Sequence, residues 1–182
     1  KDYPIAHLSW MFKRAPGFFD VVAYTGTGSV RTVSHNLNAV PELMIFKSRN
    51  TASTNWAVRC NMTSTSVHES VLQLNNGGST RGYGVGGSPN WESLSAQPTS
   101  TVINIASSNE LNASGRTFIG LLFATLPGIS KVGSYTGLNS AQNIDCGFTN
   151  GARFVLIKRT NGSSGWHLWD TTRGIVTGND PY

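Results

Sequence analysis

The stretch that decides the fold is Val21-Val22-Ala23-Tyr24-Thr25-Gly26, and it returns as Val132-Gly133-Ser134-Tyr135-Thr136-Gly137. β-Branched and aromatic residues followed by Thr-Gly are typical of a strand that ends in a turn. The sequence therefore predicts strands, and it predicts that a group of strands occurs twice.

The similarity extends well beyond these six residues. Positions 12–53 and 123–164 share 11 identities without a gap, where unrelated sequences of ordinary composition would share roughly 3. The apolar run Leu43-Met44-Ile45-Phe46-Lys47, which suits a buried central strand, returns as Phe154-Val155-Leu156-Ile157-Lys158. A unit of about 111 residues is too long for a solenoid turn or a propeller blade, and it suits a small β domain or multi-strand layer.

The second copy is incomplete. Trp166-His167-Leu168-Trp169 parallels Trp56-Ala57-Val58-Arg59 after a one-residue shift, and the sequence then ends at Tyr182. A second copy of equal length needs roughly 40 to 50 more residues, so we expect the parent protein to continue. We predict a first unit at residues 1–117 and the start of a second, truncated unit at 118–182, with packing as one continuous domain as the alternative.

Composition agrees with a β protein. Charged residues make up only 13% of the chain, whereas Ser, Thr, Asn and Gly together supply 75 of the 182 residues. Such a chain disfavours helix and favours short strands joined by many turns. We predict an all-β fold, an antiparallel, jelly-roll-like β-sandwich of two sheets packed face to face. Only Val67 to Leu74 suits a short helix.

Charge and hydropathy exclude two classes of partner. The net charge is +5, but the basic residues are scattered, whereas nucleic-acid binders concentrate them on one face or arm. The longest apolar stretch, Phe118 to Ala124, is far shorter than the ~18 residues that span a bilayer. We therefore expect neither nucleic-acid binding nor membrane insertion. Attraction to acidic cell-surface glycans stays open.

The two cysteines, Cys60 and Cys146, carry no metal-binding or redox spacing. A disulfide is possible in principle, because pairing depends on a Cα separation that sequence does not give. Since cysteine thiols are among the most buried side chains, we expect two mostly buried thiols rather than a disulfide.

No catalytic constellation stands out. Glu69 and Glu92 are the only carboxylates that we would nominate as a glycosidase pair, and their spacing gives no support. The four histidines lack zinc-ligand spacing, and no G-x-S-x-G elbow occurs. The Gly-rich segment Gly82 to Gly87 is followed by Ser-Pro-Asn-Trp, which favours a turn over a phosphate-binding helix start. We predict no enzymatic activity, no cofactor and no metal.

Aromatic residues give the one binding signal. Tyr83 and Trp91 flank the Gly-rich segment and have no second copy, so we predict that they contact a ligand or partner. Trp56, Trp166 and Trp169 stand in strand positions of both copies, and we predict that they belong to the core.

Several strings resemble a known family. The first is Pro16-Gly17-Phe18-Phe19-Asp20-Val21-Val22-Ala23-Tyr24-Thr25-Gly26-Thr27-Gly28, and the others are residues 33–37, 40–45, 129–137, 152–159 and 169–175. Together they are similar to a repeat domain of unknown function in bacteriophage tail-fibre-like and other virion surface proteins. The resemblance implies a role in the particle or in host recognition, and it carries no catalytic or ligand residues with it.

Three functions follow as hypotheses. The first is a non-enzymatic module of a phage tail fibre or surface appendage, placed on the virion surface outside the cell. Its partners would be copies of itself, neighbouring virion proteins and a host cell-surface glycan, bound through repetition of weak contacts. The second is a purely structural particle subunit, such as a capsid decoration or tube-forming protein. The third, which the scattered carboxylates favour least, is a β-sandwich glycan hydrolase.

Overall fold

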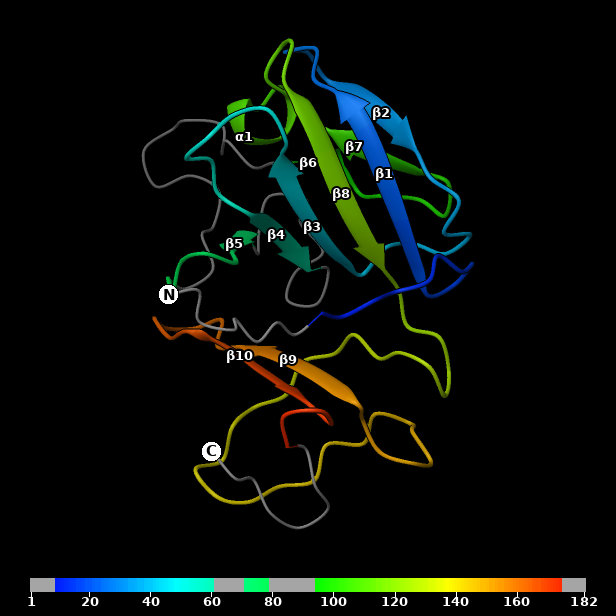
Figure 1. Ribbon diagram of the computed structural model, residues 1–182, viewed down its shortest axis with the longest axis vertical. Coiled ribbons are helices and arrows are strands. Elements are labelled where there is room, and N and C mark those ends of the chain that lie inside the picture. The colour runs from blue at the N-terminus through cyan, green and yellow to red at the C-terminus, as the bar shows by residue number, and fades with distance from the viewer. Residues whose placement is uncertain (1–8, 61–70, 79–93, 175–182) are drawn as a thin grey trace, which may run out of the picture.

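The computed structural model describes residues 9–60, 71–78 and 94–174 of the chain. Within these residues, ten strands form three antiparallel sheets, and one helical turn is present (Figure 1). The predicted all-β class is therefore confirmed. The helix, α1 (Asn109–Asn112), is a single short turn. Ser108 precedes it and caps it by accepting hydrogen bonds from the backbone N–H groups of Glu110 and Leu111. This Ser-Asn-Glu signal was missed in the sequence.

The largest sheet has five strands in the order β1-β8-β3-β4-β5. They are β1 (Phe19–Thr25), β8 (Thr117–Phe123), β3 (Leu43–Ser48), β4 (Ala57–Cys60) and β5 (Val71–Gln73). β8 lies between β1 and β3, although it comes after every other strand of this sheet in the chain. The predicted unit boundary between residues 117 and 118 thus falls inside a central strand of this sheet.

A three-stranded sheet lies behind the five-stranded one in Figure 1. It consists of β2 (Arg31–Ser34), β7 (Val102–Ile105) and β6 (Leu94–Ala96), with β7 in the middle. β2 and β7 pair along their whole length, and β6 joins the other edge of β7 with a register irregularity.

The two sheets share one hydrophobic core. Val22, Phe46 and Leu122 enter it from the five-stranded sheet, while Ile103 and Ile105 enter it from β7. Strand alternation explains this, because every second residue of a strand points to the same face of the sheet. Each such side chain, when fully buried, contributes about 1.5–3 kcal/mol to stability.

A separate two-stranded hairpin lies beneath the large sheet in Figure 1. It consists of β9 (Phe154–Lys158) and β10 (Trp166–Asp170). Trp166 attaches the hairpin to the sheet above. It packs against a second, smaller hydrophobic cluster, which consists of Ile45, Val58 and Leu72. Its Nε1–H donates a hydrogen bond to the carbonyl oxygen of Gln73 at 2.9 Å.

One turn occurs twice in the structure. Ala15 and Phe19 form an isolated antiparallel bridge, and so do their counterparts in the second copy, Leu126 and Ser130. The glycine in the third position of each turn has a positive φ, which is 76° for Gly17 and 74° for Gly128. Glycine adopts this left-handed conformation without the steric cost that a Cβ imposes, which explains why both copies read Pro-Gly.

The hairpin that follows also occurs twice. Leu43 of β3 faces Cys60 of β4, and Phe154 of β9 faces Asp170 of β10. Phe154 is the direct counterpart of Leu43, whereas Asp170 matches Cys60 only after the one-residue shift seen in the sequence. Both hairpins have the same register.

The rest of the second copy does not follow the first. β1 has its counterpart at residues 130–136, where only Ser130 forms a bridge and no strand is present. Tyr24 in β1 is 8% exposed, whereas its counterpart Tyr135 is 48% exposed. The agreement between the copies is therefore local, limited to a turn and a hairpin.

Three further predictions need correction. The predicted helix from Val67 to Leu74 is wrong where the structure describes it, since Val71–Gln73 is strand β5, which pairs with β4. Trp56 is 37% exposed and is not a core residue, because it precedes β4 at the end of the hairpin. Cys60 and Cys146 form no disulfide, as predicted, but both thiols are half-buried instead of mostly buried.

Candidate interaction surface

The second face of the five-stranded sheet is apolar and only partly covered by the described residues. We call the residues Val21, Ala23, Ile119 and Leu121 the outer sheet face. Val21 faces Leu121 and Ala23 faces Ile119 across the β1–β8 pair, so the four side chains form two adjacent rows. Ala23 is exposed and the other three are half-buried, while their sequence neighbours point into the core.

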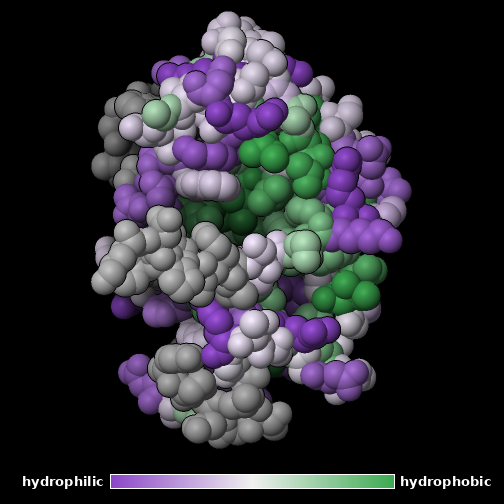
Figure 2. Space-filling view, viewed as in Figure 1, coloured by the Kyte–Doolittle hydropathy of each residue, from purple (hydrophilic) through white to green (hydrophobic). Residues whose placement is uncertain are grey.

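Figure 2 shows this face as a hollow with an apolar floor and hydrophilic rims. Lys47, which faces Ile119 across β3 and β8, brings a charge to its edge. The Lys47 ammonium donates to the carbonyl oxygen and the hydroxyl of Thr54, at 2.6 and 2.7 Å. The cation is thereby held at the rim, and the floor stays uncharged.

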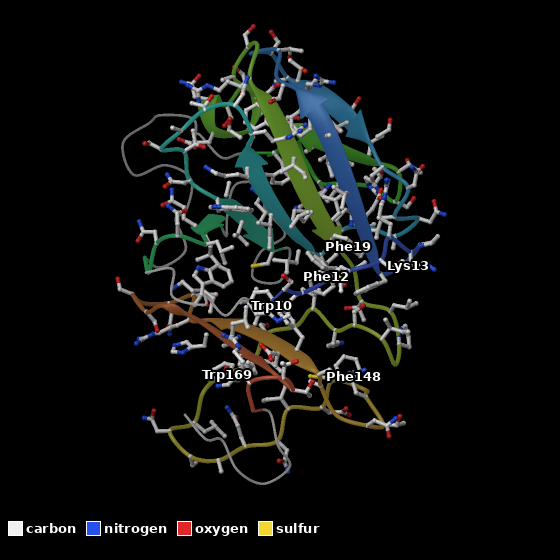
Figure 3. The ribbon with its side chains drawn as sticks, viewed as in Figure 1. Trp10, Phe12, Lys13, Phe19, Phe148 and Trp169 are labelled. Carbon is white, nitrogen blue, oxygen red and sulfur yellow. The ribbon has the colours of Figure 1, made fainter. Side chains whose placement is uncertain are left out.

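An aromatic junction closes the lower end of this face. We use that name for Trp10, Phe12, Phe19, Phe123 and Phe154. The Phe12 ring lies 5.6 Å from the rings of Phe19 and Phe123 and 5.7 Å from that of Phe154. Such tilted and edge-on pairs contribute about 0.5–1.5 kcal/mol each beyond their buried area. Figure 3 shows Trp10 and Phe12 between the large sheet and the hairpin.

Asp170 anchors the junction on its polar side. Its carboxylate accepts hydrogen bonds from the Trp10 indole N–H at 3.3 Å, from the Arg173 guanidinium at 2.8 Å and from the backbone N–H groups of Thr172 and Arg173. Burial by itself would raise the pKa of Asp170, but the backbone N–H and guanidinium of Arg173, together with the Trp10 indole, hold it below its ordinary value. Arg173 also lies 5.3 Å over the Trp10 ring as a cation–π partner.

A second buried carboxylate belongs to Asp20 of β1. Asp20 accepts hydrogen bonds from the backbone N–H groups of Asn36 and Val21, at 2.7 and 2.9 Å, and forms an ion pair with Arg14 at 2.6 Å. Burial raises its pKa, but the three donors outweigh that effect and the pKa of Asp20 lies below its usual value. Both buried carboxylates are thus fully engaged in holding the fold.

Unlike these two carboxylates, the buried cation Arg59 has a side-chain nitrogen without a hydrogen bond to any described residue. Arg59 of β4 is 5% exposed, and its Nη1 has no hydrogen-bond partner among the residues that the structure describes. Burial lowers the pKa of this guanidinium. Strand alternation puts Arg59 on the same face of β4 as Ala57, toward the core between the two sheets.

The predicted contact residues, Tyr83 and Trp91, lie outside the described residues, as do Glu69 and Glu92. Within residues 9–60, 71–78 and 94–174, no group of three or more His, Cys, Asp or Glu side chains could hold a metal ion. Over the same residues, no helix is long and apolar enough to cross a membrane.

Sequence reasoning missed the aromatic junction. A signal for it was present, because Phe12 and Phe123 are counterparts in the two copies and Phe154 is the counterpart of Leu43. In the large sheet Leu43 faces Phe123. Phe12 stands at the position of Phe123, and Phe154 stands at the position of Leu43. The contact between Phe12 and Phe154 therefore repeats the contact between Phe123 and Leu43.

A family model described as "Domain of unknown function (DUF7483)" matches residues 13–180. The chain belongs to this family. The match covers both the five-stranded sheet and the β9–β10 hairpin, so the DUF7483 region includes the outer sheet face and most of the aromatic junction. A search of curated proteins found no match, and a search of solved structures found none either.

Proposed function

We propose that this DUF7483 chain is a non-enzymatic structural module of a bacteriophage particle, part of a tail fibre or surface appendage that contributes to attachment to the host. The proposal places the module on the virion surface, where it contacts other copies of itself and neighbouring virion proteins. The phage assignment rests on the family resemblance of the sequence, and the binding role rests on the surface described above.

The apolar floor of the outer sheet face carries the binding role. Val21, Ala23, Ile119 and Leu121 occupy adjacent rows of rigid, paired strands. A contiguous apolar patch on a soluble domain is typical of a protein–protein contact, because leaving it in water forgoes the free energy of burial. Rigid strands also lose little conformational entropy when they dock.

For the fold we propose a β-sandwich that is built from an internal repeat. The shared core of the five-stranded and three-stranded sheets supports two layers facing each other. The duplicated Pro-Gly turn and the duplicated hairpin register support the repeat. On this view the second unit, which the sequence predicts to begin at residue 118, contributes β8 to the large sheet and the β9–β10 hairpin beneath it.

Two rival functions remain testable. A capsid decoration or tube-forming subunit would use the same apolar face for fixed subunit contacts and would bind no glycan. A glycan hydrolase needs two carboxylates about 5–9.5 Å apart that face a sugar. Asp20 and Asp170, the buried carboxylates described here, are each committed to structural donors, which favours the binding role.

Sedimentation velocity of the purified chain over a range of concentrations tests the self-contact. We expect assembly of the wild type and its loss in Ile119→Lys, which places a charge on the floor of the outer sheet face. The matched control is Val30→Lys, at a residue that is well exposed between β1 and β2. A wild type that stays monomeric, or equal assembly of both variants, would refute a role for this face.

Glycan binding is tested separately on an array of host surface polysaccharides. Specific, saturable binding that is lost in Tyr83→Ala or Trp91→Ala would support attachment through these residues. Blank arrays together with intact self-assembly would favour the purely structural subunit. Release of reducing ends from a polysaccharide would support the hydrolase instead.

A further inference from the structure

A buried histidine lies at the corner where β2 ends. His35 is 5% exposed, and its backbone N–H donates to the carbonyl oxygen of Thr101 at 2.8 Å. On one side of its ring, Nε2 lies 3.2 Å from the carbonyl oxygen of Thr99. On the other side, Nδ1 accepts a hydrogen bond from the backbone N–H of Leu37 at 3.2 Å. Both ring nitrogens are therefore bonded to the backbone.

These two contacts fix the protonation state of the ring. A carbonyl oxygen only accepts, so Nε2 must carry the hydrogen that bonds to Thr99. A backbone N–H only donates, so Nδ1 must be without a hydrogen to accept from Leu37. An imidazolium carries a hydrogen on both nitrogens, and its Nδ1–H would face the Leu37 N–H, donor against donor. The contacts therefore require the neutral ring.

The two residues that follow His35 connect this corner to the rest of the upper fold. Asn36 donates its backbone N–H to the carboxylate of Asp20 in β1 at 2.7 Å. The Leu37 side chain is fully buried in the main core. The Leu37 carbonyl oxygen accepts from the backbone N–H of Gly17, in the Pro-Gly turn, at 2.6 Å. Loss of the bond between His35 and Leu37 would thus loosen a residue that holds both the core and this turn.

The surroundings of the ring decide how easily it takes up a proton. Asp20 favours protonation of His35 through its negative charge, but its carboxylate is already ion-paired with Arg14 at 2.6 Å. β6, β7 and the loop between them, residues 94–105, contain no charged residue. In the connection from β2 to β3 the charged side chain is Glu42, which accepts from the backbone N–H of Thr125. Burial outweighs Asp20 and the Thr99 contact, so the pKa of His35 lies below its ordinary value.

We propose that His35 is an acid-sensitive switch: the neutral ring holds residues 35–37 against β1 and against residues 97–101, and the protonated ring releases them. The change at the switch is one added hydrogen on Nδ1, and the element that it releases is the corner between β2 and β3. Cys146 occupies the counterpart position, and a thiol gains no proton as the pH falls below 7, so the switch belongs to the first copy alone. The inference rests on these contacts and not on the proposed phage role.

The direction of the pH effect follows from the burial of the ring. In the unfolded chain His35 takes up a proton near its ordinary pKa of 6.5, whereas the buried ring of the folded chain does so at lower pH. The stabilisation by neutral His35 is therefore complete above pH 6.5 and is lost as the pH falls from 6.5 toward the folded-state pKa. One proton bound by the unfolded chain alone raises the unfolding equilibrium constant by up to about tenfold per pH unit.

The first measurement is an NMR titration of the wild-type chain, from pH 7.5 down to the pH at which the His35 ring itself titrates. Nitrogen-15 spectra of the imidazole should show His35 with its hydrogen on Nε2 at pH 7.5. The backbone amide signals of Leu37 and Gly17 should then change together with the ring, while those of Val22 and Phe46 in the core stay constant. A hydrogen on Nδ1 at pH 7.5, an unchanged Leu37 amide, or an equal change in the core would each overturn the proposal.

His35→Asn separates the charge from the contact. The asparagine oxygen accepts from the N–H two residues on, as in an Asx-turn, but the amide does not titrate. We expect this variant to lose the rise in the unfolding equilibrium constant that the wild type shows below pH 6.5, by up to about tenfold per pH unit. His167→Asn, at an exposed histidine, is the matched control and should keep the rise. A wild-type pH dependence in His35→Asn, or its loss in His167→Asn, would overturn the proposal. The titration of the wild type needs no variant, so it decides the question even if His35→Asn does not fold.

Discussion

Tyr24 and Phe118 stack face to face between β1 and β8, and the Tyr24 hydroxyl donates a hydrogen bond of 2.8 Å to the backbone carbonyl oxygen of Leu111. The bond joins the large sheet to helix α1 across the core. Burial raises the pKa of the Tyr24 phenol far above its ordinary value, so the hydroxyl stays protonated and remains a donor. Tyr135, its counterpart, is exposed and has no such partner among the described strands.

Tyr24→Phe should therefore destabilise the fold although it keeps the ring. The change leaves the Leu111 carbonyl buried without its donor, which costs about 1–3 kcal/mol. Tyr135→Phe makes the same chemical change at an exposed site and should leave stability within about 0.5 kcal/mol of wild type. Chemical denaturation of both variants checks the pair, and equal effects would contradict the contrast between the two copies.

Asp20→Asn should reduce stability at neutral pH by about 1.5–3 kcal/mol, because a carboxylate bonded to Arg14 and two backbone N–H groups becomes a neutral amide. The pKa of Asp20 is lowered in the folded state, so its ionised form stabilises the fold above the unfolded-state value near 3.8. That contribution is lost as the pH falls through the lower, folded-state pKa.

The measurement is the free energy of unfolding of wild type and Asp20→Asn between pH 7 and pH 2. The difference between the two should shrink below the ordinary value of 3.8. Asp145→Asn is the control, since Asp145 is exposed and accepts a hydrogen bond from the backbone of Gly147. A difference that stays constant with pH would show that Asp20 acts through shape and not through charge.

Gly120→Ala should destabilise the chain by about 1–3 kcal/mol, because the added methyl group would overlap Phe46 and Val22 in a packed core. Gly137→Ala is the control, since a Cβ there meets no described atom within 4 Å and the backbone φ is not positive. Thermal unfolding followed by circular dichroism checks both. Normal stability of Gly120→Ala would mean that β8 does not sit against Phe46 as described.

Trp166→Ala should release the β9–β10 hairpin without unfolding the upper sheets. The substitution removes the indole that packs near Val58 and donates to the Gln73 carbonyl oxygen. Amide exchange at residues 154–158 should accelerate, while exchange at 19–25 stays slow, because local contacts and not the core are lost. His167→Ala, on the exposed side of β10, should leave both regions unchanged. Uniform acceleration would instead indicate a single cooperative unit.

Much of the fold follows from local pattern. The apolar run Leu43 to Phe46 predicted a buried strand, and it is present as part of β3. The outer sheet face was harder to predict from the sequence, because it is formed by β1 and β8, two strands that are far apart in the chain. Periodicity shows that alternate residues share a face, but it does not show which face another layer covers. Trp56 was misjudged for a different reason: it was placed in a strand, but it precedes β4 and is exposed.

The sequence by itself determined the β class and the buried strand at Leu43 to Phe46, since each depends on residues that are close along the chain. The tertiary structure alone decided that β8 separates β1 from β3, and that Tyr24 is buried while Tyr135 is not. Two similar strings took different conformations because a strand is stable only when a neighbour satisfies its backbone and covers its side chains. β1 has that neighbour in β8, and residues 130–136 have none among the described strands.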